Sequence, residues 1–300
     1  MIINEQTLSL TFKGFQTIYG EHLLQGETHW DKIAMTIPST GRSETYAWLG
    51  DFPQLREWIG PRHVNSLSAH GFTIENRKFE STIGLKRDDL ADDRLGVFRP
   101  IIAEMGVQAR NHPEHLIFEL LAKGFETECF DGQPFFDADH PVKDADGTVQ
   151  SVSNIQAGSS TPWFLLDTSR ALRPIIWQER EGYEFQSMDR PENPHVFKND
   201  EYLYGVRARV NAGFGLWQLA FGSKAALNRE NYAAARAAMM GYRADGGRIL
   251  GVKPTLLVVP PALEDAALQL LNAENDAAGA SNVWRNTAEL VVTPFLSGAA

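Results

Sequence analysis

The sequence lacks the features that bind nucleic acid, form disulfides or cross a membrane. Lysine and arginine total 28 against 38 for aspartate and glutamate, so the formal net charge is −10 and the positive footprint of a nucleic-acid-binding protein is missing. The one cysteine, Cys129, cannot form an internal disulfide or a cysteine-rich zinc site, which favours a reducing compartment. The most apolar run, Thr255 to Val259, stops at Pro260, far short of the ~20 residues that span a bilayer. Glu5 and polar neighbours stand where a signal peptide would need an unbroken apolar stretch.

The common motifs of enzymes are also absent. Gly213, Gly215 and Gly222 lie near predicted strands, but no GxGxxG or GxxxxGK[ST] pattern leads into a helix. No GxSxG nucleophile elbow occurs, and Cys129 has no obvious base beside it in the sequence. We therefore expect a protein that is not an enzyme, with no catalytic residue, no cofactor and no bound metal.

What the sequence does contain is a folded mixture of helices and strands. Apolar residues make up 43% of the 300 residues, charged residues 22% and aromatic residues 10%, which is typical of one large or two ordinary domains. The periodicity predicts helices at 8–24, 95–105, 111–124, 229–242 and 262–271, and strands at 44–49, 72–85, 163–167, 175–178, 215–221, 256–259 and 289–295. Pro100 and Pro113 predict a kink or a division into two helices between Asp92 and Lys123. This interleaving indicates a mixed α/β body.

The segment from Thr36 to Leu85 is a long, loop-rich excursion. Its basic and acidic side chains are equal in number between Thr40 and Leu85, and it carries aromatic residues that we expect to be exposed, such as Trp48 and Phe79. Local neutrality with exposed aromatic side chains is typical of an arm that lies on a neighbouring protein. The residues that we expect to contact a neighbouring subunit are Arg42, Trp48, Arg56, Glu57, Trp58, Arg77 and Lys78.

The densest polar cluster runs from Asp131 to Pro141 and allows two interpretations. One is a metal-dependent hydrolase in the cytosol that uses Asp131, Asp137, Asp139 and His140 as ligands or catalytic groups. The other is a structural loop, because no HExxH or calcium-loop spacing accompanies the cluster and aspartate side chains commonly brace turns. The structural loop comprises Asp131, Phe135, Phe136, Asp137, Asp139 and His140. We favour the loop and keep the hydrolase as the alternative.

Several short segments together resemble the major head subunit family of Mu-like phages. They are YAWLG at 46–50, FEST at 79–82, LLAKGF at 120–125, FFDADHP at 135–141, WFLLDTSR at 163–170, RVNAGFGLWQ at 209–218 and NVWR at 282–285. Each segment is weak evidence alone, but their order and spacing are specific. The resemblance covers the chain from about Phe12 to Leu296.

The resemblance implies an α+β fold, the tailed-phage major capsid fold of the Hong Kong 97-like type. The expected divisions are an N-terminal arm (1–35), an extended β-hairpin loop (36–85), a peripheral domain with a spine helix (86–162), an axial domain (163–271) and a C-terminal return to the peripheral domain (272–300). It further implies a subunit that assembles into hexamers and pentamers of an icosahedral head in the host bacterial cytoplasm and encloses double-stranded DNA in the virion. Possible partners are portal, scaffold, maturation protease and decoration proteins, and no membrane is involved.

Overall fold

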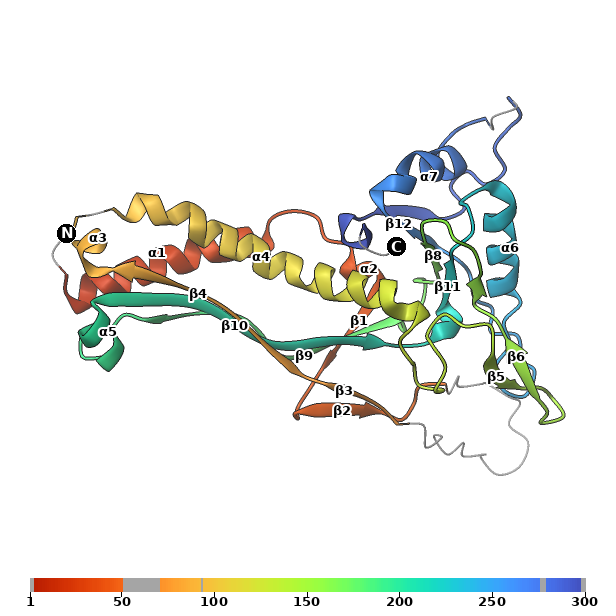
Figure 1. Cartoon of the computed structure of the whole chain (residues 1–300), viewed down its shortest axis with the longest axis horizontal. Helices are drawn as coiled ribbons and strands as arrows, with labels where there is room; N and C mark the ends of the chain where they lie inside the picture. The colour runs from red at the N-terminus through yellow and green to blue at the C-terminus, as the bar shows by residue number, and fades with distance from the viewer. Residues whose placement is uncertain (1–2, 51–70, 93, 276–278, 298–300) are drawn as a thin grey trace.

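The computed structural model describes residues 3–50, 71–92, 94–275 and 279–297, which form an elongated half and a more compact half (Figure 1). In the elongated half, helices α1 (Glu5–Leu24) and α4 (Leu95–Ala122) lie along one side of long strands. The compact half holds a second sheet with helices α6 (Arg229–Met240) and α7 (Glu264–Leu271). Within the described ranges, no helix combines the length and the apolar character needed to cross a bilayer.

The elongated half is built on a four-stranded sheet with the order β1-β9-β10-β4. Strands β9 (Ile175–Met188) and β10 (Glu201–Phe214) are antiparallel and joined through the short helix α5 (Pro194–Asn199). Strand β4 (Arg77–Lys86) pairs antiparallel with β10, and β1 (Ala34–Pro38) pairs parallel with β9. Alternate residues of β10, from Tyr202 to Val210, are buried, because side chains in a strand point to opposite faces. This buried face packs against α1 and α4.

Of the two outcomes expected at Pro100 and Pro113, a kink or a division into two helices, the division is wrong. Helix α4 runs without interruption through Pro100 and Pro113. A proline inside a helix removes one hydrogen bond and costs ~3 kcal/mol or more. The apolar face of α4 is buried along almost its whole length, and each fully buried large apolar side chain contributes ~1.5–3 kcal/mol. This burial offsets the two proline penalties; the residues are Ile102, Met105, Ala109, Leu116, Ile117, Phe118 and Leu121.

The compact half is built on a five-stranded sheet with the order β13-β12-β8-β11-β7. Its central strands, β8 (Trp163–Leu166) and β12 (Leu256–Val259), are fully buried, since layers cover both faces. The flanking strands are β7 (Ile155–Gln156), β11 (Ala220–Ser223) and β13 (Glu289–Val292). The strand expected at 215–221 starts later, at Ala220, because a 3-10 turn occupies Trp217–Leu219.

The two sheets divide the chain differently from the expected contiguous ranges. Strands β9 and β10 fall in the range expected for the axial domain, yet they form the long sheet with β4. Strand β13 falls in the range expected to return to the peripheral domain, yet it pairs in parallel with β12 of the five-stranded sheet. Sequence analysis also missed β10 and most of β9, although apolar residues at alternate positions of β10, from Tyr202 to Val210, were the available signal for a strand.

The excursion from Thr36 to Leu85 is less detached than expected. A two-stranded ladder of β2 (Ser43–Tyr46) and β3 (Phe72–Glu75) projects from the body (Figure 1), but its Tyr46 and Ile74 side chains are buried in the main core. The expected exposure of Trp48 and Phe79 is wrong, since both side chains are half-buried against that core. The expected contacts at Arg56, Glu57 and Trp58 lie outside the described residues.

Candidate functional site

The loop from Asp131 to Pro141 links the end of α4 to strand β5 (His140–Lys143) and is anchored by two buried phenylalanines. Phe135 stacks on Phe214 of β10 with ring centroids 4.3 Å apart, and Phe136 packs on Phe164 of β8 at 5.3 Å. Gly124 and Gly222 pass so close to Phe136 that a Cβ atom at either glycine would lie within 2.8 Å of its ring. The loop therefore contacts both sheets.

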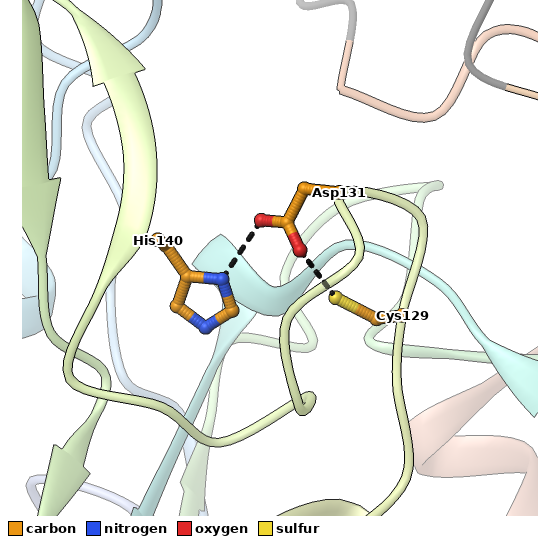
Figure 2. Close-up of side chains that lie close together, drawn as sticks. All are labelled: Cys129, Asp131 and His140. Carbon is orange, nitrogen blue, oxygen red and sulfur yellow. Dashed lines mark hydrogen bonds and ion pairs between the residues drawn. The ribbon is translucent and has the colours of Figure 1, made fainter.

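Behind the phenylalanines, three polar side chains form a hydrogen-bonded chain (Figure 2). Asp131 accepts a hydrogen bond from the Cys129 thiol at 3.1 Å and another from His140 Nδ1 at 2.8 Å. It also accepts the backbone N–H of Gln133 at 3.1 Å. Burial raises the pKa of Asp131, but the hydrogen bonds from His140 and Cys129 outweigh it and hold the pKa below its ordinary value.

His140 is fully buried and held on both sides of its ring. Its Nε2 lies 3.1 Å from the Oδ1 of Asn154, and that oxygen also accepts the backbone N–H of Asp137 at 2.8 Å. Asn154 Nδ2 donates to the carbonyl of Phe135, which fixes the amide in this orientation. Both ring nitrogens of His140 therefore lie within hydrogen-bonding distance of a side-chain oxygen, which fixes the orientation of the ring. The ring also stacks on Trp217, with centroids 4.0 Å apart and planes 9° apart.

The donor set fits a metal ion poorly. The ligand atoms of Cys129, Asp131 and His140 lie within 4.8 Å of one another, but each is already engaged in the hydrogen bonds described above. Burial, and then the neighbouring Asp131, raise the pKa of the Cys129 thiol, which disfavours the thiolate that a metal would bind. The cluster can hold a loop in place, but its groups are not open to a substrate.

The other two aspartates of the hydrolase alternative are directed elsewhere. Asp137 accepts the backbone N–H of Asp139 at 2.9 Å, and Asp139 is exposed and bonded to Ser151 of β6 (Val149–Val152). The structure thus brings Asp131 and His140 together but does not add Asp137 and Asp139 to their cluster. Sequence reasoning missed Asn154 and Trp217, because no local motif connects them to a loop that precedes them by many residues.

The predicted contact residues that the structure describes are distributed over the excursion. Arg42 lies on the projecting ladder, is 85% exposed and pairs with Glu75 of the same chain, Nε to Oε1, at 3.1 Å. Arg77 stands over the Phe79 ring at 5.1 Å, and Lys78 is exposed on the edge strand β4. That these residues and the half-buried Trp48 contact a neighbouring subunit stays a prediction.

Known proteins resemble this chain over nearly its whole length. The family model of the Mu-like prophage major head subunit gpT matches residues 8–296. The major capsid protein of Escherichia phage Mu is 42% identical over 305 residues, covering 99% of this chain and all of that protein. A chain of the bacteriophage JBD30 procapsid is 44% identical with a TM-score of 0.88, over 98% of this chain and 100% of that one.

A further solved structure, the JBD30 capsid decorated with minor capsid protein trimers, contains a chain that is 33% identical with a TM-score of 0.76, over 91% of this chain and 92% of that one. These matches confirm the α+β tailed-phage capsid fold and the role of major capsid protein expected from the sequence, and they lend no support to the hydrolase alternative. The chain belongs to the Mu-like prophage major head subunit family.

Proposed function

We propose that this chain self-assembles into the hexamers and pentamers of an icosahedral phage head and encloses double-stranded DNA. The observation that supports this most is the match of sequence and fold over the whole chain to major capsid proteins, one of them in a procapsid. A net charge of −10 suits a container for DNA, because an inner surface without a strong positive patch does not trap the packed polyanion.

The two halves of the structure suggest a revised division into domains. The elongated half, with α4 as the spine helix and the β1-β9-β10-β4 sheet, would be the peripheral domain. The compact half, including the terminal strand β13, would be the axial domain. Helix α1 would be the N-terminal arm, and the β2–β3 ladder would belong to the extended loop.

The Asp131 to Pro141 loop would serve this function as a brace and not as a catalytic site. It ties the two sheets together through Phe135 and Phe136, and its carboxylates accept hydrogen bonds from within the same chain. Such a junction would hold the two halves of a capsid subunit in a fixed relation during assembly. No catalytic residue is required.

Further partners are proposed from the family alone. A chain similar to this one belongs to a capsid decorated with minor capsid protein trimers, so a decoration protein is a reasonable partner. Portal, scaffold and maturation protease would join during assembly in the bacterial cytoplasm, and the product would be the virion.

Imaging of the purified chain tests this proposal. We expect sedimentation and negative-stain microscopy to show shells, rings or other large closed oligomers, with no change on treatment with a chelator. A small discrete species with a metal-dependent hydrolytic activity would contradict the proposal and revive the alternative.

A further inference from the structure

Helix α4 carries a guanidinium group whose inner donors lack acceptors. The Nε and Nη1 atoms of Arg110 are shielded from solvent and have no hydrogen-bond partner in the part of the chain that the structure describes. A guanidinium stays charged in proteins, and burying its donors without acceptors is unfavourable. The surroundings of Arg110 therefore destabilise the conformation that the structure shows.

The connection between α1 and the short helix α2 (Trp30–Ile33) covers this guanidinium. We call this connection, residues 25–29, the strap. Gly26 has a φ of 96°, which favours glycine, and its backbone passes so close that a Cβ atom there would overlap Nη1 of Arg110. Residues 25–27 are exposed, so the strap covers Arg110 while burying little surface of its own.

One buried carboxylate holds the end of the strap. Glu114 is 4% exposed and accepts the backbone N–H groups of His29 and Trp30. It lies four residues after Arg110 on α4, the spacing at which oppositely charged side chains of a helix can pair. Because Glu114 bonds to the strap, Arg110 is left without this acceptor, and Nδ1 of His29 is also buried without a partner. Glu114 therefore has two competing sets of donors.

The helices at the two ends of the strap are fixed by packing. Phe15 and Tyr19 of α1 are buried in the core of the elongated half. Ile33 of α2 is fully buried, and the ring of Trp30 packs on Trp177 with centroids 5.6 Å apart. The strap itself makes no comparable apolar contact, so it can rearrange without moving either helix.

We propose that the strap is a reversible clasp that opens while both helices stay docked. In the closed form, which the structure shows, Glu114 holds the N–H groups of His29 and Trp30, and Arg110 is covered. In the open form, Glu114 pairs with Arg110, the released groups of His29 and Trp30 become hydrated, and Gly26 is the hinge. The new ion pair offsets the lost hydrogen bonds, so the open form is populated under native conditions. Opening makes the connection between α1 and the body slack, and it is a property of the single chain that does not depend on assembly.

Hydrogen exchange tests the clasp, measured by mass spectrometry on peptides of the purified chain that contain residues 25–30. Arg110→Leu removes both the covered charge and the competing partner of Glu114, so exchange in the strap should slow by about tenfold. Arg99→Leu is the matched control, because Arg99 is exposed on the same helix, and it should change the rate by less than about twofold. Unchanged or faster exchange in Arg110→Leu would show that the arginine supports the closed strap, and would overturn the proposal.

A double-mutant cycle tests whether Glu114 changes partners. In the wild type, Glu114→Gln weakens both the closed strap and the open ion pair, so its two effects partly cancel. In the Arg110→Leu background it weakens only the closed strap. Glu114→Gln should therefore accelerate exchange at least about threefold more in that background than in the wild type. Equal acceleration in both backgrounds would show that Glu114 does not pair with Arg110 when the strap opens.

A substitution at Gly26 tests whether opening is confined to the strap. A side chain at Gly26 is strained at this φ and would overlap Arg110, so Gly26→Ala should speed exchange of residues 25–30 by about tenfold. Exchange of peptides from α1 should stay within about twofold of the wild type, because that helix remains docked. The matched control is Gly20→Ala, where a Cβ atom meets nothing within 4 Å, and it should leave both rates unchanged. An equal increase in α1, or no increase in the strap, would contradict a local clasp.

Discussion

At the scale of single residues, two side chains of the Asp131 to Pro141 loop should contribute very differently to the free energy of unfolding. Phe136 is 1% exposed and packs among the rings of Phe125 and Phe164, so Phe136→Ala should cost ~3–5 kcal/mol. Asp139 is exposed, so Asp139→Ala should cost no more than the ~0.5–1.5 kcal/mol of one hydrogen bond. Denaturant unfolding of the soluble subunit measures both values. If Asp139→Ala instead had the larger effect, leaving the fold intact but abolishing an activity, the loop would be catalytic.

The lowered pKa of Asp131 gives this loop a defined response to acid. The folded pKa lies below the unfolded value of ~3.9, so the carboxylate stabilises the fold at any pH above that value. This stabilisation is lost as the pH falls through the folded pKa. We expect the free energy of unfolding to decrease once the pH is lower than about 4. In the Asp131→Asn variant this decrease in the free energy of unfolding should be smaller than in the wild type. Identical acid profiles for the variant and the wild type would count against the hydrogen bonds from His140 and Cys129.

The same loop shows what could be predicted from sequence at this scale. The cluster of Asp131 with His140 was visible because the two residues lie close together in the chain. Asn154 and Trp217, which orient and cover His140, could not be found, because their roles depend on how β7 and the turn before β11 pack. Side-chain partners that come from distant elements leave no local pattern.

At the scale of elements, α4 is joined to the N-terminal region by one buried carboxylate. Glu114 is 4% exposed and accepts the backbone N–H groups of His29 and Trp30, at the start of α2 (Trp30–Ile33). Glu114→Ala should leave both partly buried donors without this partner, at a cost of no more than ~1–3 kcal/mol for each. The expected result is faster proteolysis between Leu24 and Trp30. The control is Glu119→Ala on the same helix, where the side chain is 43% exposed, and similar proteolysis in both variants would refute the proposed anchor.

Helices and strands differed in how far the sequence predicted them. Helix α1 and the buried strands β8 and β12 follow clear apolar patterns and were predicted within a few residues of their observed bounds. The break in α4 was predicted wrongly, because local rules for proline do not include the tertiary burial that holds the helix together. Strand β10 was missed although buried residues alternate along it, and its pairing with β4 and β9 joins segments far apart in the chain, which no local pattern specifies.

At the scale of the whole molecule, distant segments are combined in each half. The long sheet takes strands from the N-terminal third and from the middle of the chain, and the compact sheet takes its edge strand β13 from the C-terminal region. Lys32 of α2 also pairs with Glu289 of β13 at 2.6 Å, which connects the segment after α1 to the last strand. Composition and periodicity do not specify this arrangement, and the contiguous ranges that the resemblance implied did not describe it either.

Assembly of the whole molecule should respond to salt in a way that separates charge from apolar burial. Lys78 is exposed on the free edge strand, so Lys78→Glu should reduce shell yield at 0.1 M salt if it meets carboxylates of a neighbouring subunit. The Debye length falls from ~10 Å to ~3 Å between 0.1 M and 1 M salt, so the difference from the wild type should shrink at 1 M. Lys78→Gln controls for loss of the side chain without reversal of charge. Each pair contributes only ~0–1 kcal/mol, but repetition over a shell makes the effect measurable in sedimentation profiles. If the shell yield changed neither with salt nor with the Lys78→Glu substitution, apolar contacts would remain as the driving force for assembly.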